Sequence, residues 1–138
     1  MRVDFYILSD PAPDARERIS CRLAEKAYKM GHTVYLHTDS EGQAQRLDDL
    51  LWAFRAGSFV PHARSGSGQE SPILIGSGEP AADADLLITL SASVPAFYER
   101  FGRVAEIIDG SEENKRTGRE RFRFYRDRGL QPQSHHLA

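Results

Sequence analysis

Residues 3–13 read VDFYILSDPAP, an apolar, β-prone run that ends in a turn containing two prolines. Such a run predicts a strand, and the Asp-Pro turn predicts passage into a helix, with Asp10 as its cap. Apolar residues then recur at helical spacing and mark one buried stripe, which Gly31 can close in the left-handed conformation. The stripe comprises Ile19, Leu23, Ala27 and Met30. The chain therefore opens with a strand followed by a helix.

The same order of elements repeats further along the chain. Residues 33–37 are β-prone, and Ser40 and Gln43 have the spacing of a helix-capping box. The next helix has an apolar face made of Ala44, Leu47, Leu51 and Phe54. Further strands are predicted at 72–75, 85–90 and 103–108, a short helix at 94–101, and a long helix from 111 or 112 to 128.

This alternation of strands and helices predicts an α/β fold. Residues 85–90 contain a continuous Leu-Leu-Ile run, which is typical of a strand buried on both faces. Parallel strands need crossover connections, and the crossover helices need a sheet on which to bury their apolar stripes. We expect a mostly parallel sheet with helices on both faces.

Size and composition indicate one globular domain. The chain has 138 residues, of which 40% are hydrophobic and 28% are charged. No apolar run approaches the roughly 20 residues that span a bilayer, and Met1 does not open a signal sequence, so we expect a cytoplasmic protein. The single cysteine, Cys21, cannot form an internal disulfide and is expected to pack in the interior.

Motifs for catalysis, cofactors and metals are absent from the sequence. The first strand is followed by residues 10–13, DPAP, and neither a Gly-x-Gly-x-x-Gly nor a Gly-Lys-Ser/Thr phosphate-binding motif follows it. The five histidines show no diagnostic ligand spacing, and no Gly-x-Ser-x-Gly elbow is present. We therefore expect no catalytic residues, cofactor or metal. A degenerate nucleotide-binding enzyme stays an alternative because the fold itself is compatible with it.

Positive charge is concentrated near the carboxyl end. Residues 115–128 hold seven basic and two acidic residues, although the whole chain has a net charge of −2. On the predicted helix, one face presents three guanidinium groups around an aromatic ring: Arg119, Phe122, Arg123 and Arg126, at i, i+3, i+4 and i+7. Guanidinium groups bind carboxylates bidentately, and a ring can line a pocket for an apolar side chain. This face suits an acidic peptide; direct binding of single-stranded DNA would use the same arginines.

A second group of large apolar residues lies near the end of the helix predicted after residue 40. It comprises Trp52, Phe54, Phe59 and Val60. These side chains fit either core packing or an exposed hydrophobic site for a partner protein. The sequence pattern leaves both interpretations open.

Five short motifs, taken in order, give the chain a specific resemblance. They are Val3-Asp4-Phe5-Tyr6, Leu50-Leu51-Trp52, Ser58-Phe59-Val60-Pro61-His62, Phe97-x-x-x-Phe101-x-Arg103-Val104, and Gly118-Arg119-Glu120-Arg121-Phe122-x-x-Tyr125-Arg126. In this order they resemble the chi subunits of bacterial DNA polymerase III holoenzyme over residues 3–130.

The resemblance implies a single Rossmann-like, three-layer domain over residues 1–130 without nucleotide chemistry, followed by a polar tail at 131–138. It implies a non-catalytic subunit of the clamp-loader assembly that takes part in DNA replication and contacts DNA mainly indirectly. It also implies two partners, the psi subunit and the acidic C-terminal peptide of single-stranded DNA-binding protein. The implied psi-binding residues are Trp52, Phe59, Val60, Pro61 and His62. The implied peptide-binding residues are Arg119, Phe122, Arg123, Tyr125, Arg126 and Gly129.

Overall fold

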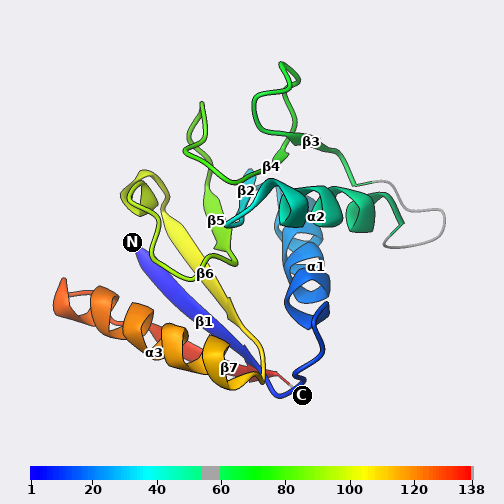
Figure 1. Cartoon of the computed structure of the whole chain (residues 1–138). Helices are drawn as coiled ribbons and strands as arrows, with labels where there is room; N and C mark the ends of the chain where they lie inside the picture. The colour runs from blue at the N-terminus through cyan, green and yellow to red at the C-terminus, as the bar shows by residue number, and fades with distance from the viewer. Residues whose placement is uncertain (54–59, 138) are drawn as a thin grey trace.

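The computed structural model describes residues 1–53 and 60–137 and contains a seven-stranded sheet in which all paired strands run parallel (Figure 1). The spatial order of the strands is β3-β4-β2-β5-β6-β1-β7. Their bounds are β1 Arg2–Leu8, β2 Val34–His37, β3 His62–Arg64, β4 Ile73–Gly76, β5 Leu86–Thr89, β6 Arg103–Ile108 and β7 Gln133–Leu137. The predicted α/β fold with a mostly parallel sheet is confirmed.

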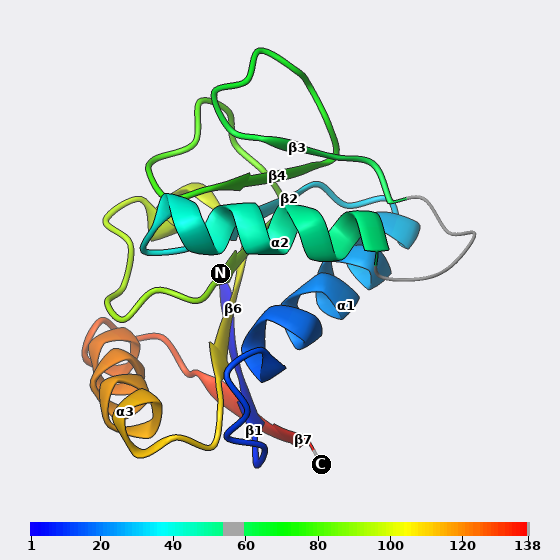
Figure 2. The ribbon, with the colours of Figure 1, turned by 45° about the vertical axis from the view of Figure 1, so that its right-hand side comes forward.

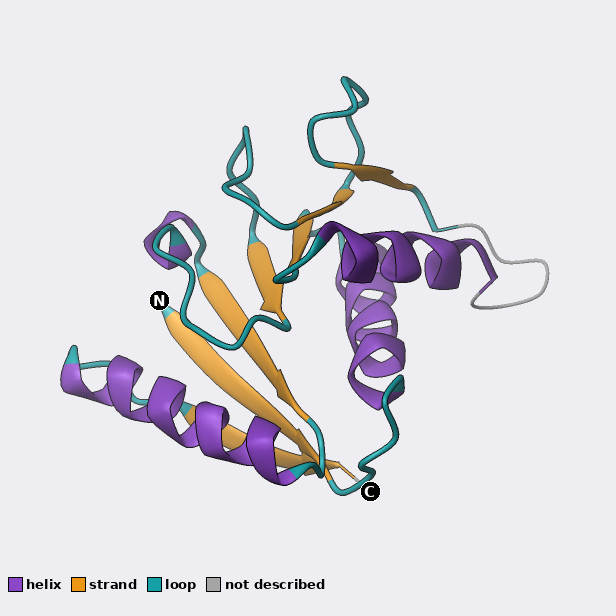
Figure 3. Cartoon of the chain, in the orientation of Figure 1, coloured by secondary structure: helices purple, strands orange, loops and turns teal. Residues whose placement is uncertain are grey.

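Within the described residues, three α-helices cover the two faces of this sheet (Figures 2 and 3). Helices α1 (Ala15–Lys29) and α2 (Glu41–Ala53) lie on one side, and α3 (Glu112–Asp127) lies on the other. Neighbouring residues of one strand enter different cores: Leu36 packs in the cluster with α1 and α2, whereas Tyr35 packs in the cluster with α3. The result is the predicted three-layer arrangement.

The central strands carry the apolar core. In β5, Leu87 and Ile88 are fully buried although they point to opposite faces, as the continuous apolar run predicted. In the described parts of the chain, no helix is long and apolar enough to cross a membrane, and no three acidic, histidine or cysteine side chains are grouped to hold a metal ion.

Local signals fixed two of the three helix starts. The Ser40 hydroxyl accepts a hydrogen bond from the Gln43 backbone N–H at 3.1 Å, as predicted, and the Ser111 hydroxyl caps α3 by accepting from Asn114 at 3.3 Å. The prediction of Asp10 as the cap of α1 is wrong. Its carboxylate accepts from the Ala12 N–H at 2.9 Å within a turn, and α1 begins only at Ala15, because Pro13 disfavours helical geometry in the residue before it.

The end of α1 also differs from the prediction. Met30, expected in the buried stripe, is 66% exposed because the helix ends at Lys29. Gly31 then adopts a φ of +86°, the left-handed conformation that the sequence indicated. Phe54, expected on the apolar face of α2, lies outside the described residues.

Two strands were missed, and a predicted helix is shorter than expected. Residues 94–101 contain only a 3₁₀ turn, η1, at Tyr98–Arg100. Strands β3 and β7 are the two edges of the sheet, and β7 falls within the segment expected to be a polar tail. An edge strand pairs on one side only and tolerates polar residues, so neither segment carries the apolar pattern of a buried strand.

The loops that follow β1 and β6 meet at the carboxyl edge of the sheet. The chain leaves β1 for α1 on one face and leaves β6 for α3 on the other, an arrangement that opens a ligand crevice in many α/β proteins. Here the Gly110 N–H donates to the Asp10 carbonyl at 3.0 Å, and a Cβ on Gly110 would overlap the Ser9 carbonyl group. The two loops therefore touch through backbone atoms at this point, and an open hollow of about 250 Å³, lined in part by Asp39, Leu90 and Asp109, lies at the same edge of the sheet.

This close approach predicts that Gly110→Ala destabilises the fold. The new methyl group would push against backbone atoms that cannot rotate away, at a cost of about 1–3 kcal/mol in the free energy of unfolding. Chemical denaturation followed by circular dichroism would measure the change. Gly78→Ala is the matched control, because a Cβ there meets no atom within 4 Å. Equal stability of the two variants would contradict the close-packing argument.

Candidate functional site

The outward face of α3 presents three arginine side chains. Arg119, Arg123 and Arg126 are all exposed, and in the described part of the chain none of their guanidinium groups has an ion pair or hydrogen bond. Arg116 on the same helix differs, since it pairs with Glu113 and with Glu120 at 2.9 Å. The three arginines can therefore bind an anionic partner without first breaking an internal ion pair.

An apolar groove, here called the α3 groove, runs beside these arginines. It is an open hollow of about 240 Å³ between α3 on one side and strands β1 and β7 on the other. Its lining residues are Phe5, Ile7, Ile108, Lys115, Gly118, Arg119, Phe122 and Ser134. The groove combines an apolar floor with a cationic rim, which suits an apolar side chain carried on an acidic segment.

Phe122 belongs both to the groove and to the core. Its side chain is half-buried, and its ring centroid lies 5.2 Å from that of Phe5 in a tilted arrangement. Gly118, one turn earlier, lets α3 approach β6 closely, because a Cβ there would overlap the Ile108 side chain. The ring is thus held in place as a fixed wall of the groove.

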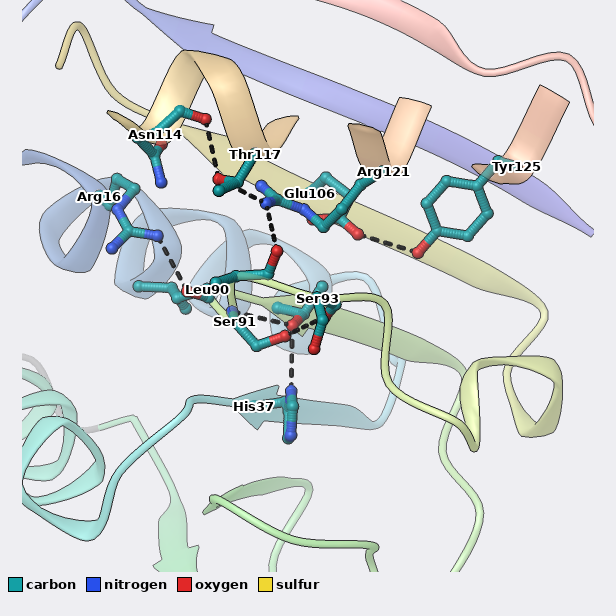
Figure 4. Close-up of polar contacts among 12 residues, drawn as sticks. Arg16, His37, Leu90, Ser91, Ser93, Glu106, Asn114, Thr117, Arg121 and Tyr125 are labelled. Atoms are coloured by element: carbon teal, nitrogen blue, oxygen red, sulfur yellow. Dashed lines mark hydrogen bonds and ion pairs between the residues drawn. The ribbon is translucent and has the colours of Figure 1, made fainter. Parts of the chain in front are cut away.

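A buried polar network fixes α3 from the other side (Figure 4). The Arg121 guanidinium pairs with the Glu106 carboxylate at 2.8 Å, and the Tyr125 hydroxyl donates to the same carboxylate at 2.9 Å. Arg121 also donates to the Ala92 carbonyl and to the Thr117 hydroxyl, each at 3.0 Å. Arg121 and Tyr125 stand one helical turn apart on the face of α3 that points into the protein.

Burial and charge set the protonation of this network. Burial raises the pKa of Glu106, while the Arg121 guanidinium opposes that rise. Burial and the nearby Glu106 carboxylate raise the pKa of Tyr125, which keeps the phenol protonated as a donor. Tyr125, expected at the peptide site, is fully buried and lies on the opposite side of α3 from the exposed arginines.

Gly129, the remaining residue expected at the peptide site, ends α3. Its φ is +84°, its N–H donates to the Arg126 carbonyl at 3.0 Å, and the Leu130 N–H donates to the Tyr125 carbonyl at 3.2 Å. This is a Schellman-type cap, which requires the left-handed conformation that glycine adopts easily. Gly129 therefore turns the chain from α3 toward β7.

Of the residues expected to bind psi, those that the structure describes lie around the end of α2 and the start of β3. Trp52 is 60% exposed, and its ring centroid lies 4.8 Å from that of His62. The His62 ring is buried and lies 2.6 Å from the Val60 carbonyl and 3.4 Å from the Asp48 carboxylate. Val60 is buried, Pro61 is half-buried, and Phe59 lies outside the described residues. Trp52 thus forms an exposed aromatic surface, which His62 supports from beneath.

The structure also reveals groove residues that the sequence analysis missed. Lys115 precedes Arg119 by one helical turn, so the four-residue spacing of the basic side chains could have found it. Phe5 and Ile7 alternate in β1 and share the face toward α3, a signal that the period of a strand contains. Ser134 gave no signal, because its segment was not predicted to be a strand.

Comparisons with known proteins show which family the sequence resembles. Residues 1–133 match the protein family described as "DNA polymerase III chi subunit, HolC". The chain is 43% identical to "DNA polymerase III subunit chi" of Pseudomonas aeruginosa over 137 residues, which cover 99% of this chain and 96% of that protein. It is 34% identical to the protein of the same name from Escherichia coli over 134 residues, with 91% of each chain covered. A further relative with that name, from Haemophilus influenzae, is 31% identical over 129 residues, covering 91% of this chain and 90% of the relative.

The buried network predicts that Arg121→Met destabilises the protein. The substitution leaves the Glu106 carboxylate buried without its guanidinium, which costs about 3–5 kcal/mol when one partner of a buried pair is removed. Urea denaturation would measure the loss. Arg123→Met is the matched control, because the same change on the exposed face should alter the free energy of unfolding by less than about 0.5 kcal/mol. Similar stabilities for the two variants would refute the anchoring role of Arg121.

Proposed function

Because the chain belongs to the DNA polymerase III chi subunit family, we propose that it joins the psi subunit to the acidic C-terminal peptide of single-stranded DNA-binding protein. As a chi subunit it is a non-catalytic accessory subunit of DNA polymerase III. In this proposal the two partners bind at separate surfaces of one domain in the cytoplasm. Contact with DNA is mainly indirect and passes through single-stranded DNA-binding protein.

The α3 groove carries the peptide half of the proposal. Arg119, Arg123 and Arg126 are exposed and have no ionic partner in the described residues, and the apolar groove opens next to Arg119. Acidic side chains of the peptide would pair with the guanidinium groups, while an apolar residue of the peptide enters the groove. Tyr125 and Gly129 support this site indirectly by anchoring and ending the helix.

Trp52 carries the psi half of the proposal. A large aromatic side chain that is 60% exposed and rests on a buried ring has the character of an interface anchor. His62 lies against the Trp52 ring, and Val60 and Pro61, which precede it in the chain, would help to shape the surface that psi meets. Phe59 enters the proposal through the family resemblance alone.

The positions of the two surfaces support a bridging role. β3 and β7 are opposite edges of the sheet; the psi surface adjoins β3, and the α3 groove adjoins β7. The helices that carry the two sites also cover opposite faces (Figure 2). Both partners can therefore bind at once, and tethering several weak contacts within one assembly raises their effective concentration.

The peptide half predicts that Arg123→Ala weakens binding of a synthetic acidic peptide with an apolar carboxyl end. Loss of one charge-assisted contact should reduce affinity roughly tenfold, as measured by isothermal titration calorimetry. Arg116→Ala is the control on the same helix, because Arg116 is already paired with acidic neighbours and should change affinity less than about threefold. Unchanged affinity of Arg123→Ala would reject the site. Tighter binding to a bare oligonucleotide than to the peptide, with a steep salt dependence, would instead favour a direct DNA binder.

The psi half predicts that Trp52→Ala disrupts the complex with psi. Truncating an anchor of this kind costs about 2 kcal/mol or more, which is roughly a 30-fold loss of affinity and should be visible in co-purification and calorimetry. Peptide binding should be unaltered in the same variant, and Arg123→Ala should leave psi binding intact. Loss of both activities in Trp52→Ala would show that the residue supports the fold and would count against a separate psi surface.

A further inference from the structure

Strand β7 holds a fixed position at the edge of the sheet. It pairs in parallel with β1 from Asp4 opposite Gln133 to Leu8 opposite Leu137. No neighbour pairs with its outer side in the described residues, and Figure 1 shows β7 on the same end of the sheet as α3. The segment expected to be a polar tail is therefore part of the sheet beside the α3 groove.

One face of β7 anchors the strand to β1. The His135 ring lies 2.8 Å from the Asp4 carboxylate and stacks on the Tyr6 ring with centroids 5.0 Å apart. Asp4 is fully buried and also pairs with Arg103 at 3.0 Å. Burial alone would raise the pKa of Asp4, but the hydrogen bonds from His135 and Arg103 hold it below its usual value. A charged acceptor thus keeps His135, and with it β7, against the sheet.

The other face of β7 looks into the α3 groove. Successive residues of a strand point to opposite faces, so Ser134 lies on the side away from His135, and Ser134 lines the groove together with Phe5 and Ile7. Across the hollow stand Lys115 and Arg119 of α3. The groove therefore has a cationic wall on the helix, an apolar floor and a short, uncharged, exposed wall on β7.

We propose that β7 is the second wall of the peptide site, with Ser134 beside the bound acidic peptide. This inference rests on the proposed function and adds a structural element to it. An apolar side chain of the peptide that reaches the floor passes between α3 and β7, and its acidic neighbours then lie within reach of both walls. The small side chain of Ser134 keeps the entrance open, and its lack of charge avoids repulsion.

Charge substitutions at Ser134 test this placement because they change affinity in opposite directions. Ser134→Glu should weaken binding of the acidic peptide roughly threefold to fivefold, and Ser134→Lys should strengthen it by a similar factor, as expected for one exposed charge pair. Both changes in affinity should become smaller at high salt concentration. Fluorescence anisotropy with a labelled peptide measures them.

Gln133 offers matched controls one position away. It is exposed, and it lies on the His135 face of β7, so Gln133→Glu and Gln133→Lys place the same charges on the other side of the sheet. The affinity of each Gln133 variant for the peptide should stay within about twofold of the parent value. Salt weakens the interaction between an exposed charge on the far side of the sheet and a peptide in the groove. Circular dichroism should show unchanged folding for all four variants.

The outcomes separate this inference from the proposed function. Parent-like affinity in both Ser134 variants, while Arg119→Ala binds weakly, would overturn the β7 wall and leave the arginine site standing. Equal effects at Ser134 and Gln133 would also overturn it, because they would reflect net charge alone. Parent-like affinity of Arg119→Ala for the peptide would contradict the proposed peptide site itself. The proposal that β7 is a wall of the site is supported if the two Ser134 variants change peptide affinity in opposite directions while the Gln133 variants leave it unchanged.

Discussion

The buried ion pair between Glu106 of β6 and Arg121 of α3 determines which side of α3 meets solvent. A carboxylate in the interior needs its cationic partner, and removing that partner costs several kcal/mol, so α3 cannot rotate without separating the pair. Tyr125, one turn further, donates to the same carboxylate and strengthens the constraint. The exposed arginines then lie on the opposite side of the helix as a geometric consequence.

This constraint separates two uses of arginine on one helix. Arg121 is enclosed and forms part of the fold, whereas Arg119 and Arg123 are exposed and have no partner in the described residues. Charge density alone does not distinguish them, since all three lie in the same basic segment. Burial against a carboxylate distinguishes Arg121 from the other two, because a paired guanidinium is no longer available to a ligand.

The sequence predicted those parts of the structure whose signals are local or strongly apolar. The buried strand around Leu87 and Ile88, the cap at Ser40 and the left-handed turn at Gly31 all followed from the residues themselves. It failed at the cap of α1, where Pro13 delayed the start of the helix beyond Asp10. It also failed at the edge strands, whose pairing depends on a distant partner, because β7 joins β1 across more than a hundred residues.

The candidate site was also predictable only in part, because the sequence carries the local pattern of one helix but not its tertiary neighbours. Helical spacing predicted Arg119, Phe122 and Arg123 on one face; in the structure Arg119 and Phe122 line the groove, and Arg123 is exposed on the same helix. The groove beside them needed tertiary information, since its floor comes from β1 and its far wall from β7. A pattern read along one helix can reveal the charged rim of a site, but the opposite wall comes from whichever strand the sheet places there.

The loops that follow β1 and β6 are held together at the carboxyl edge of the sheet. Gly110 and Asp10 join the two loops by a backbone hydrogen bond where related architectures admit a ligand. The exposed arginines and Trp52 lie elsewhere, on the outer faces of helices near the two sheet edges. Trp52 lies near one edge and the arginines of α3 lie near the other, so under the proposed function a partner bound at one surface would leave the other surface uncovered.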